Sequence, residues 1–222
     1  MGIKSVMNTD RLYWLGRYSE RVYTTLRLFS HSFDTLIEQY GGDHRGFCAS
    51  LEIPDIYADK DAFIDSYAFS TDDPNSIVSN LYRAYDNAIE LREEIGSETL
   101  SFIQMAIYEM NNAKRSDAPL LYFQKITDAI LAFWGCVDDQ IDDENTRNII
   151  KIGKRIERID LYARLRKDKV AIRRDVNRLA ARITRTELIY SKDGLEQLKA
   201  IVDAPELDYG EIIRIVESLV EC

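Results

Sequence analysis

Apolar residues recur at alternating steps of three and four along most of the chain, and this spacing limits the fold more than any other feature. It places apolar side chains on one face of an α-helix, whereas a half-buried strand needs alternation at every second residue. No stretch alternates long enough to predict a strand. Glycine and proline, which interrupt helices, number only 10 and 4 among 222 residues. The chain is therefore predicted to be all-α.

The ends of the apolar stretches coincide with capping residues, glycine and proline. The first stretch begins after Asn8 and Thr9 and stops at Gly41, and a later one is preceded by Asp73, a candidate cap. We expect helices over residues 9–40, 77–95, 98–110, 119–137, 144–163, 172–186, 195–202 and 212–219, with a short helix as one option around 59–67. The predicted architecture is a single antiparallel bundle of about seven or eight helices, with residues 1–222 forming one domain.

Two of the predicted helices carry the same pattern at an offset of 137 residues. Residues 15–28 read LGRYSERVYTTLRL and residues 152–165 read IGKRIERIDLYARL. The offset matches Gly16 with Gly153, Glu20 with Glu157, Arg21 with Arg158, and Arg27 with Arg164. This match predicts an internal pseudo-repeat.

The glycine of each copy stands one turn before the glutamate, so it allows another backbone to approach closely and brings the carboxylate into that contact. We predict that the two helices cross antiparallel. Glu20 is then expected to pair with Arg164. Glu157 is expected to pair with Arg27.

Two interpretations of these Glu-Arg steps remain open. One is a polar groove whose arginines bind a carboxylate or phosphate while a glutamate acts as base, and the other is a buried ion-pair network that fixes helix register. The candidate groove residues are Arg17, Glu20, Arg21, Arg27, Glu157, Arg158 and Arg164, with Trp14 and Trp134 as a candidate pocket wall. No residue is assigned as catalytic.

Two further charged patterns have alternative explanations. Asp138, Asp139 and Asp142 form a DDxxD-like stretch that suits magnesium and a diphosphate, or else a solvated helix end in which Asp142 or Asp143 caps the next helix. A row of arginines is either a basic strip for an acidic partner or a helix face neutralised within the chain. Its members are Arg173, Arg174, Arg178, Arg182 and Arg185.

Charge and cysteine content exclude several classes of protein. The 29 Lys and Arg against 38 Asp and Glu give a net charge of −9, which argues against nucleic-acid binding as the main function. Three separated cysteines form no CxxC pair, so we predict neither disulfides nor a thiolate zinc site. We find no signal segment and no uncharged run of membrane-spanning length. The expectation is a cytoplasmic protein without metal, cofactor or membrane association, with homo-oligomerisation left open.

Several stretches together resemble the alpha-E domain family, an all-helical bacterial group named for its Glu-Arg motif. RLYWLGRYSER (Arg11 to Arg21) resembles the opening signature of this family, and IIKIGKRIERIDLYARL (Ile149 to Leu165) resembles its third block. Between them, DDPNSI and RAYDNAIELREEIGSETL resemble the second block, and the likeness covers residues 8–165. The resemblance implies that the gene for this chain lies beside genes for ATP-grasp ligase-like and transglutaminase-like proteins. It does not imply a particular reaction, because members of the family have no assigned chemistry.

The resemblance therefore favours an accessory or scaffold protein that partners an ATP-grasp-type peptide ligase or a transglutaminase-like peptidase in making or processing a peptide-like product. The first alternative is an enzyme of amide-bond chemistry with a Glu/Arg site between the two repeat helices. The second is a magnesium-dependent diphosphate enzyme that uses the DDxxD-like stretch.

Overall fold

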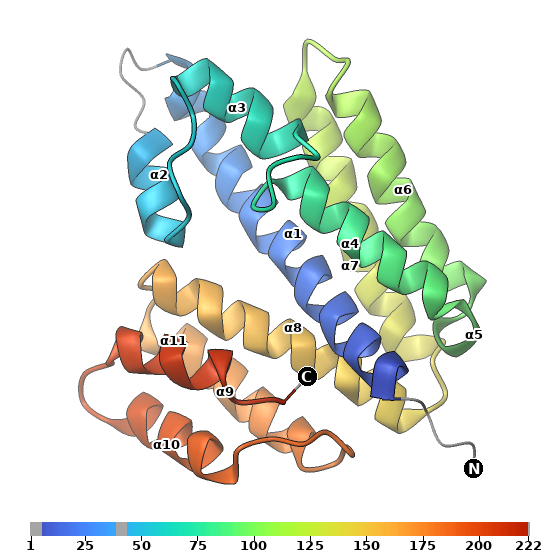
Figure 1. Cartoon of the computed structure of the whole chain (residues 1–222), viewed down its shortest axis with the longest axis vertical. Coiled ribbons are helices and arrows are strands. Elements are labelled where there is room, and N and C mark those ends of the chain that lie inside the picture. The colour runs from blue at the N-terminus through green and yellow to red at the C-terminus, as the bar shows by residue number, and fades with distance from the viewer. Residues whose placement is uncertain (1–5, 39–43, 222) are drawn as a thin grey trace. The chain divides into compact units, whose positions relative to one another are not determined.

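The computed structural model describes residues 6–38 and 44–221, and helices account for most of both ranges (Figure 1). They are α1 (Val6–Glu38), α2 (His44–Leu51), α3 (Lys60–Phe69), α4 (Ile77–Glu90), α5 (Arg92–Ile95), α6 (Ser97–Ala113), α7 (Pro119–Asp139), α8 (Glu144–Arg164), α9 (Lys169–Ile183), α10 (Lys192–Asp203) and α11 (Tyr209–Glu217). These ranges contain no strand, only an isolated antiparallel bridge between Tyr190 and Val220. The all-α prediction is confirmed.

The expected number of helices was too low, since the described residues form eleven. Helix α2 spans only two turns, which is too short to produce a periodic apolar pattern. The stretch expected as one helix over 77–95 divides at Leu91, where φ −99° and ψ 13° depart from helical values although the side chain stays buried. Apolar spacing reports the buried face and does not register such a local change in the backbone.

The start of α4 also differs from the prediction. Ser76, rather than Asp73, is its N-cap and accepts the backbone N–H of Ser79 at 3.0 Å. The Asp73 carboxylate instead accepts the hydroxyl of Tyr57 at 2.6 Å. Burial, together with this bond, raises the pKa of Tyr57. Asp73 therefore ties the preceding loop to the helix start.

The helices gather into two compact units, and α1 contributes residues to both. One unit comprises Arg21–Ile141, and the other comprises the residues up to Glu20 together with those from Asp142 onward. The assignment of the whole chain to one domain stays a prediction.

The Arg21–Ile141 unit has an aromatic core around Phe29. The ring of Phe29 lies 5.7–6.2 Å from the rings of Phe47, Phe63, Tyr67 and Phe123, which come from α2, α3 and α7. Helices α6 and α7 pack along each other, and α4 packs against α6 (Figure 1). This unit therefore closes around side chains contributed from distant parts of the sequence.

Helix α7 is the one helix among the described residues whose length and composition would allow it to cross a membrane. Eight of its residues are buried, as expected for a core helix. The expected absence of membrane association stays a prediction.

The second unit packs α8 against α9 and α11, with α10 against α9. Four N-caps fix where its helices begin, because each accepts the N–H of the residue three positions later at 2.8–3.0 Å. The caps are Asp143, Asp168, Ser191 and Asp208. Asp143 thus caps α8, as one interpretation of the acidic stretch predicted.

Candidate functional site

Helices α1 and α8 touch backbone to backbone at two matched glycines. A Cβ atom on Gly16 would lie 2.0 Å from the carbonyl oxygen of Ile150, and one on Gly153 would lie 2.1 Å from that of Tyr13. Tyr13 and Ile150 are related by the same offset of 137 residues, so the contact is reciprocal. Only glycine permits this approach. The predicted pseudo-repeat therefore corresponds to two related helices that cross each other.

Glu20 lies one turn beyond this crossing and is enclosed by protein. Its side chain is 0% exposed, and its two carboxylate oxygens accept the Nε and Nη2 atoms of Arg158 at 2.6 and 2.8 Å. Burial opposes the charge on Arg158, but the attraction of Glu20 outweighs it and raises the pKa of this guanidinium. The two-point geometry fixes the orientation of both side chains.

Glu157 is enclosed in the same way on the other helix. It is 0% exposed, and its Oε2 atom accepts Nε of Arg17 at 2.7 Å. The guanidinium of Arg17 also lies over the ring of Trp14, 5.0 Å from its centre. Burial works against the charge of Arg17, and Glu157 overcomes this effect, so the pKa of Arg17 is raised.

Each glutamate therefore pairs with an arginine of the other helix, as predicted. The particular arginines that were predicted were wrong. Glu20 binds Arg158 rather than Arg164, and Glu157 binds Arg17 rather than Arg27. Arg164 stands eleven residues past Gly153, roughly 16 Å along the axis, by which point crossing helices have diverged. Arg158 stands only five residues past it, within reach of Glu20.

The remaining groove candidates have other surroundings. Arg164 donates to Asp160 at 3.0 Å and to Glu217 of α11 at 2.6 Å, and so ties α8 to α11. Burial raises the pKa of Asp160, with Arg164 opposing that change. Arg21 and Arg27 lie on the part of α1 that belongs to the Arg21–Ile141 unit.

Arg27 is exposed and donates to the Tyr23 hydroxyl at 3.2 Å. It also lines a hollow of about 300 Å³ with Ser30 and Gln124. Arg21 is half-buried, and its carbonyl oxygen accepts the hydroxyl of Thr25 at 2.7 Å.

The two tryptophans named as a pocket wall have separate packing partners. Trp14 stacks on Tyr18 with ring centres 5.3 Å apart. Trp134, on α7, is buried in the Arg21–Ile141 unit, where its ring meets that of Phe133 at 4.9 Å. Each tryptophan therefore has an aromatic neighbour within its own unit.

The DDxxD-like stretch is spread over a helix end, a connection and a cap. Asp138 and Asp139 are exposed at the end of α7, whereas Asp142 lies in the connection to α8. In the part of the chain that the structure describes, no three His, Cys, Asp or Glu side chains gather as a metal site requires.

Sequence reasoning missed an ion pair between α8 and α9. Arg155 donates to Asp175 at 2.5 Å, and the Asp175 side chain is 0% exposed. In the same hairpin Arg182 donates to the side-chain oxygen of Asn148 at 2.8 Å. In each pair the two residues lie equally far in sequence from residue 165, which stands just past the end of α8. An antiparallel hairpin that turns at this residue therefore brings the members of both pairs opposite each other.

Two lysines on α8 are also perturbed in ways that the sequence did not indicate. Burial, reinforced by Arg182 and Arg155, lowers the pKa of Lys151 to about 8. Burial also lowers the pKa of Lys154 to about 7, although Glu20 partly opposes it. Lys151 therefore lies near arginines of both α8 and α9, whereas Lys154 lies near Glu20 of α1.

The fold and these contacts define an all-helical protein in which the motif glutamates of two related helices are buried where the helices cross. Residues 8–202 match the Alpha-E family, described as a predicted alpha-helical domain with a conserved ER motif. The match covers most of the chain and extends through α9 into α10, and the chain belongs to this family. No curated protein and no solved structure matches the chain.

Proposed function

We propose that this protein is an accessory or scaffold protein that partners an ATP-grasp-type peptide ligase or a transglutaminase-like peptidase in making or processing a peptide-like product. The observation that carries the proposal is the enclosure of both motif carboxylates. Glu20 and Glu157 are each 0% exposed and bonded to an arginine. The choice of partner rests on the gene neighbourhood that the family resemblance implies.

A general base must reach the proton that it removes and must be free to accept it. The Glu20 and Glu157 carboxylates instead accept hydrogen bonds from guanidinium groups at 2.6–2.8 Å, so these oxygens are already occupied. The same arrangement suits a structural role, because breaking a buried pair from one side leaves an uncompensated charge. The Glu-Arg steps would then hold α1 against α8 and give partners a rigid surface.

The proposal is tested by expressing the tagged chain with an ATP-grasp-type ligase encoded beside an Alpha-E gene. We expect the two proteins to co-elute in size-exclusion chromatography. We also expect ligase product, measured by mass spectrometry, to increase when the chain is present. The control is the ligase alone, run on the same column and assayed for product in the same way.

The amide-bond enzyme is the competing function, and the same material tests it. Formation or cleavage of an amide by the purified chain alone, with activity lost in Glu20→Gln at unchanged stability, would contradict the proposal. Magnesium-dependent turnover of a diphosphate that is lost in Asp138→Ala would contradict it as well.

A further inference from the structure

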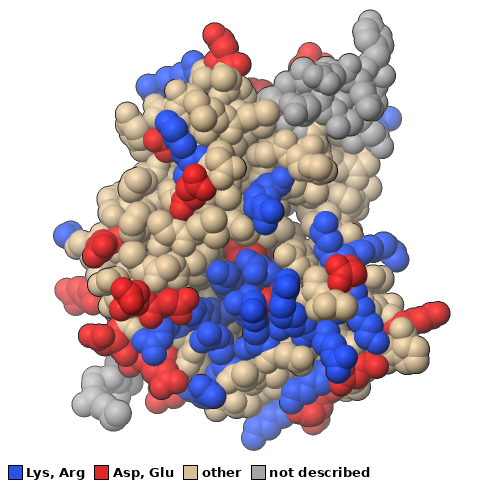
Figure 2. All heavy atoms as spheres, turned by 180° about the vertical axis from the view of Figure 1, so that it is seen from behind, with Lys and Arg blue, Asp and Glu red and all other residues tan. Residues whose placement is uncertain are grey.

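The α8–α9 hairpin concentrates positive charge in a chain whose net charge is negative. Residues 144–185 contain 14 Lys and Arg but only 5 Asp and Glu, which gives this segment a formal charge of +9. The net charge of the whole chain is −9. Seen from behind, Lys and Arg side chains gather into a dense group in the lower half of the molecule (Figure 2). We call the group formed by Arg174, Arg178, Arg182 and Arg185 the α8–α9 basic surface.

The acidic residues of the hairpin leave this surface largely uncompensated. Three of the five are engaged by Arg17, Arg164 and Arg155, and Asp168 caps α9. Outside the hairpin, Asp203 binds Arg173 at 2.8 Å, so that member of the arginine row is neutralised within the chain. The row is thus not neutralised as a whole.

Three of the arginines that remain follow one flank of α9. Arg174, Arg178 and Arg182 are spaced by four residues and extend over roughly 12 Å at 1.5 Å per residue, and Arg185 lies two residues past the end of the helix. Arg174, Arg178 and Arg185 are exposed, and none of the three forms an ion pair with a residue that the structure describes. Arg182 donates to an amide oxygen rather than to a carboxylate.

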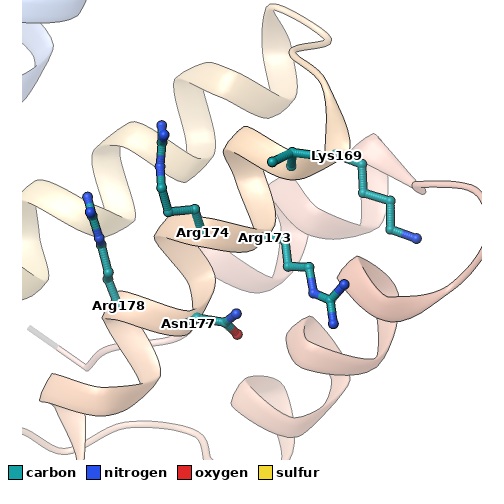
Figure 3. Close-up of a pocket in the computed structure, with 6 residues that line it drawn as sticks. Lys169, Arg173, Arg174, Asn177 and Arg178 are labelled. Carbon is teal, nitrogen blue, oxygen red and sulfur yellow. The ribbon is translucent and has the colours of Figure 1, made fainter.

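A hollow of about 510 Å³ lies along α9 beside this row. Arg174 and Arg178 extend side by side from one flank of the helix, and Lys169 and Arg173 extend from the other (Figure 3). Val170 also lines the hollow and is 76% exposed, which adds an apolar contact among the charges. All the lining residues come from α9, so the hollow is open and suits an extended partner better than an enclosed small molecule.

We propose that the α8–α9 basic surface is the docking site for an acidic, carboxylate-rich segment of the partner protein. Guanidinium groups placed one turn apart can each bind a carboxylate through two hydrogen bonds. Charge complementarity of this kind guides a partner to its site and fixes its register. This inference rests on the proposed function, because it names the surface that the partner would use.

The observations favour an acidic protein segment over a nucleic acid. A phosphate backbone continues beyond a strip of roughly 12 Å. In this chain the Arg21–Ile141 unit carries only 9 Lys and Arg against 20 Asp and Glu, which repel a long polyanion. A short acidic segment, by contrast, can end where the arginine row ends.

The first experiment measures binding of fluorescein-labelled decaglutamate to the full chain by fluorescence anisotropy. We expect binding that weakens as salt rises, and a loss of roughly tenfold in affinity in the double variant Arg174→Glu/Arg178→Glu. The matched control is Lys114→Glu/Arg115→Glu, which makes the same charge change at exposed positions just after α6. Its affinity is expected to equal that of the wild type. Circular dichroism melts establish that both variants fold.

Equal decaglutamate binding by the wild type and Arg174→Glu/Arg178→Glu would overturn the inference. So would binding of inorganic tripolyphosphate or a short RNA by a wild-type chain that does not bind decaglutamate. The second experiment repeats ligase co-elution with both variants. Ligase retained equally by all three proteins overturns the docking site and leaves the proposed function standing. If the ligase does not co-elute with the wild-type chain while decaglutamate still binds, the proposed function is overturned and the site for an acidic segment remains supported.

Discussion

Replacing Gly16 by alanine tests whether the crossing of α1 and α8 holds its unit together. The new methyl carbon would lie 2.0 Å from the backbone oxygen of Ile150, where ordinary contacts begin at 3.4 Å. The helices must therefore separate by roughly 1.4 Å, because a backbone atom cannot rotate away as a side chain can. Overpacking of this kind costs up to about 3 kcal/mol. The higher helix propensity of alanine offsets about 1 kcal/mol of this destabilisation, so the unfolding free energy should fall by about 2 kcal/mol.

The assay is urea unfolding followed by circular dichroism, with a thermal melt as a second measure. For a chain of this length about 2 kcal/mol corresponds to a fall in Tm of roughly 4–8 °C. Gly210→Ala is the control in the same unit, because its methyl group would meet Asp208 at an ordinary 3.6 Å. We expect this variant to be as stable as the wild type or slightly more stable. A Gly16→Ala protein at least as stable as Gly210→Ala would refute the close crossing.

Two further predictions concern α8. Burial lowers the pKa of Lys154 to about 7 from 10.5 in the unfolded chain, with Glu20 opposing and Arg158 reinforcing the change. The unfolded state therefore binds this proton more tightly, and stability should rise with pH between about 7 and 10.5. Lys154→Met should flatten that rise in urea unfolding at pH 6.5 and 9, and an unchanged slope would exclude a buried lysine. Asp143→Ala should cost about 1 kcal/mol by removing the α8 cap, whereas Asp142→Ala should not. Equal melts of the two alanine variants would contradict the capping role.

Much of the fold follows from local sequence signals. Apolar spacing identified the long helices, because a buried helical face needs a residue every three or four positions. Asp143 was recognisable as a cap since it stands directly before such a stretch. The close approach of α1 and α8 at Gly16 and Gly153 was recognisable because both copies of the repeat carry glycine at the same place.

The identity of the ion-pair partners could not be predicted in the same way. Sequence gives the face on which Glu20 lies, but the angle at which helices diverge decides whether Arg158 or Arg164 reaches it. The pair of Arg155 and Asp175 depends on where the α8–α9 hairpin turns, and that position is fixed by packing as well as by the local caps. The depressed lysine pKa values depend on burial, which periodicity does not measure.

The most direct test of the Glu-Arg motif as a structural element is a double-mutant cycle on Glu20 and Arg158. Glu20→Met and Arg158→Met, each alone, should lower the unfolding free energy by about 3–5 kcal/mol, because each removes one partner of a buried ion pair. The double variant should lose far less than the sum, with a coupling above about 2 kcal/mol, and should still co-elute with the ligase. Additive losses below about 1 kcal/mol, accompanied by loss of the ligase complex, would instead place these residues in a binding or reaction site.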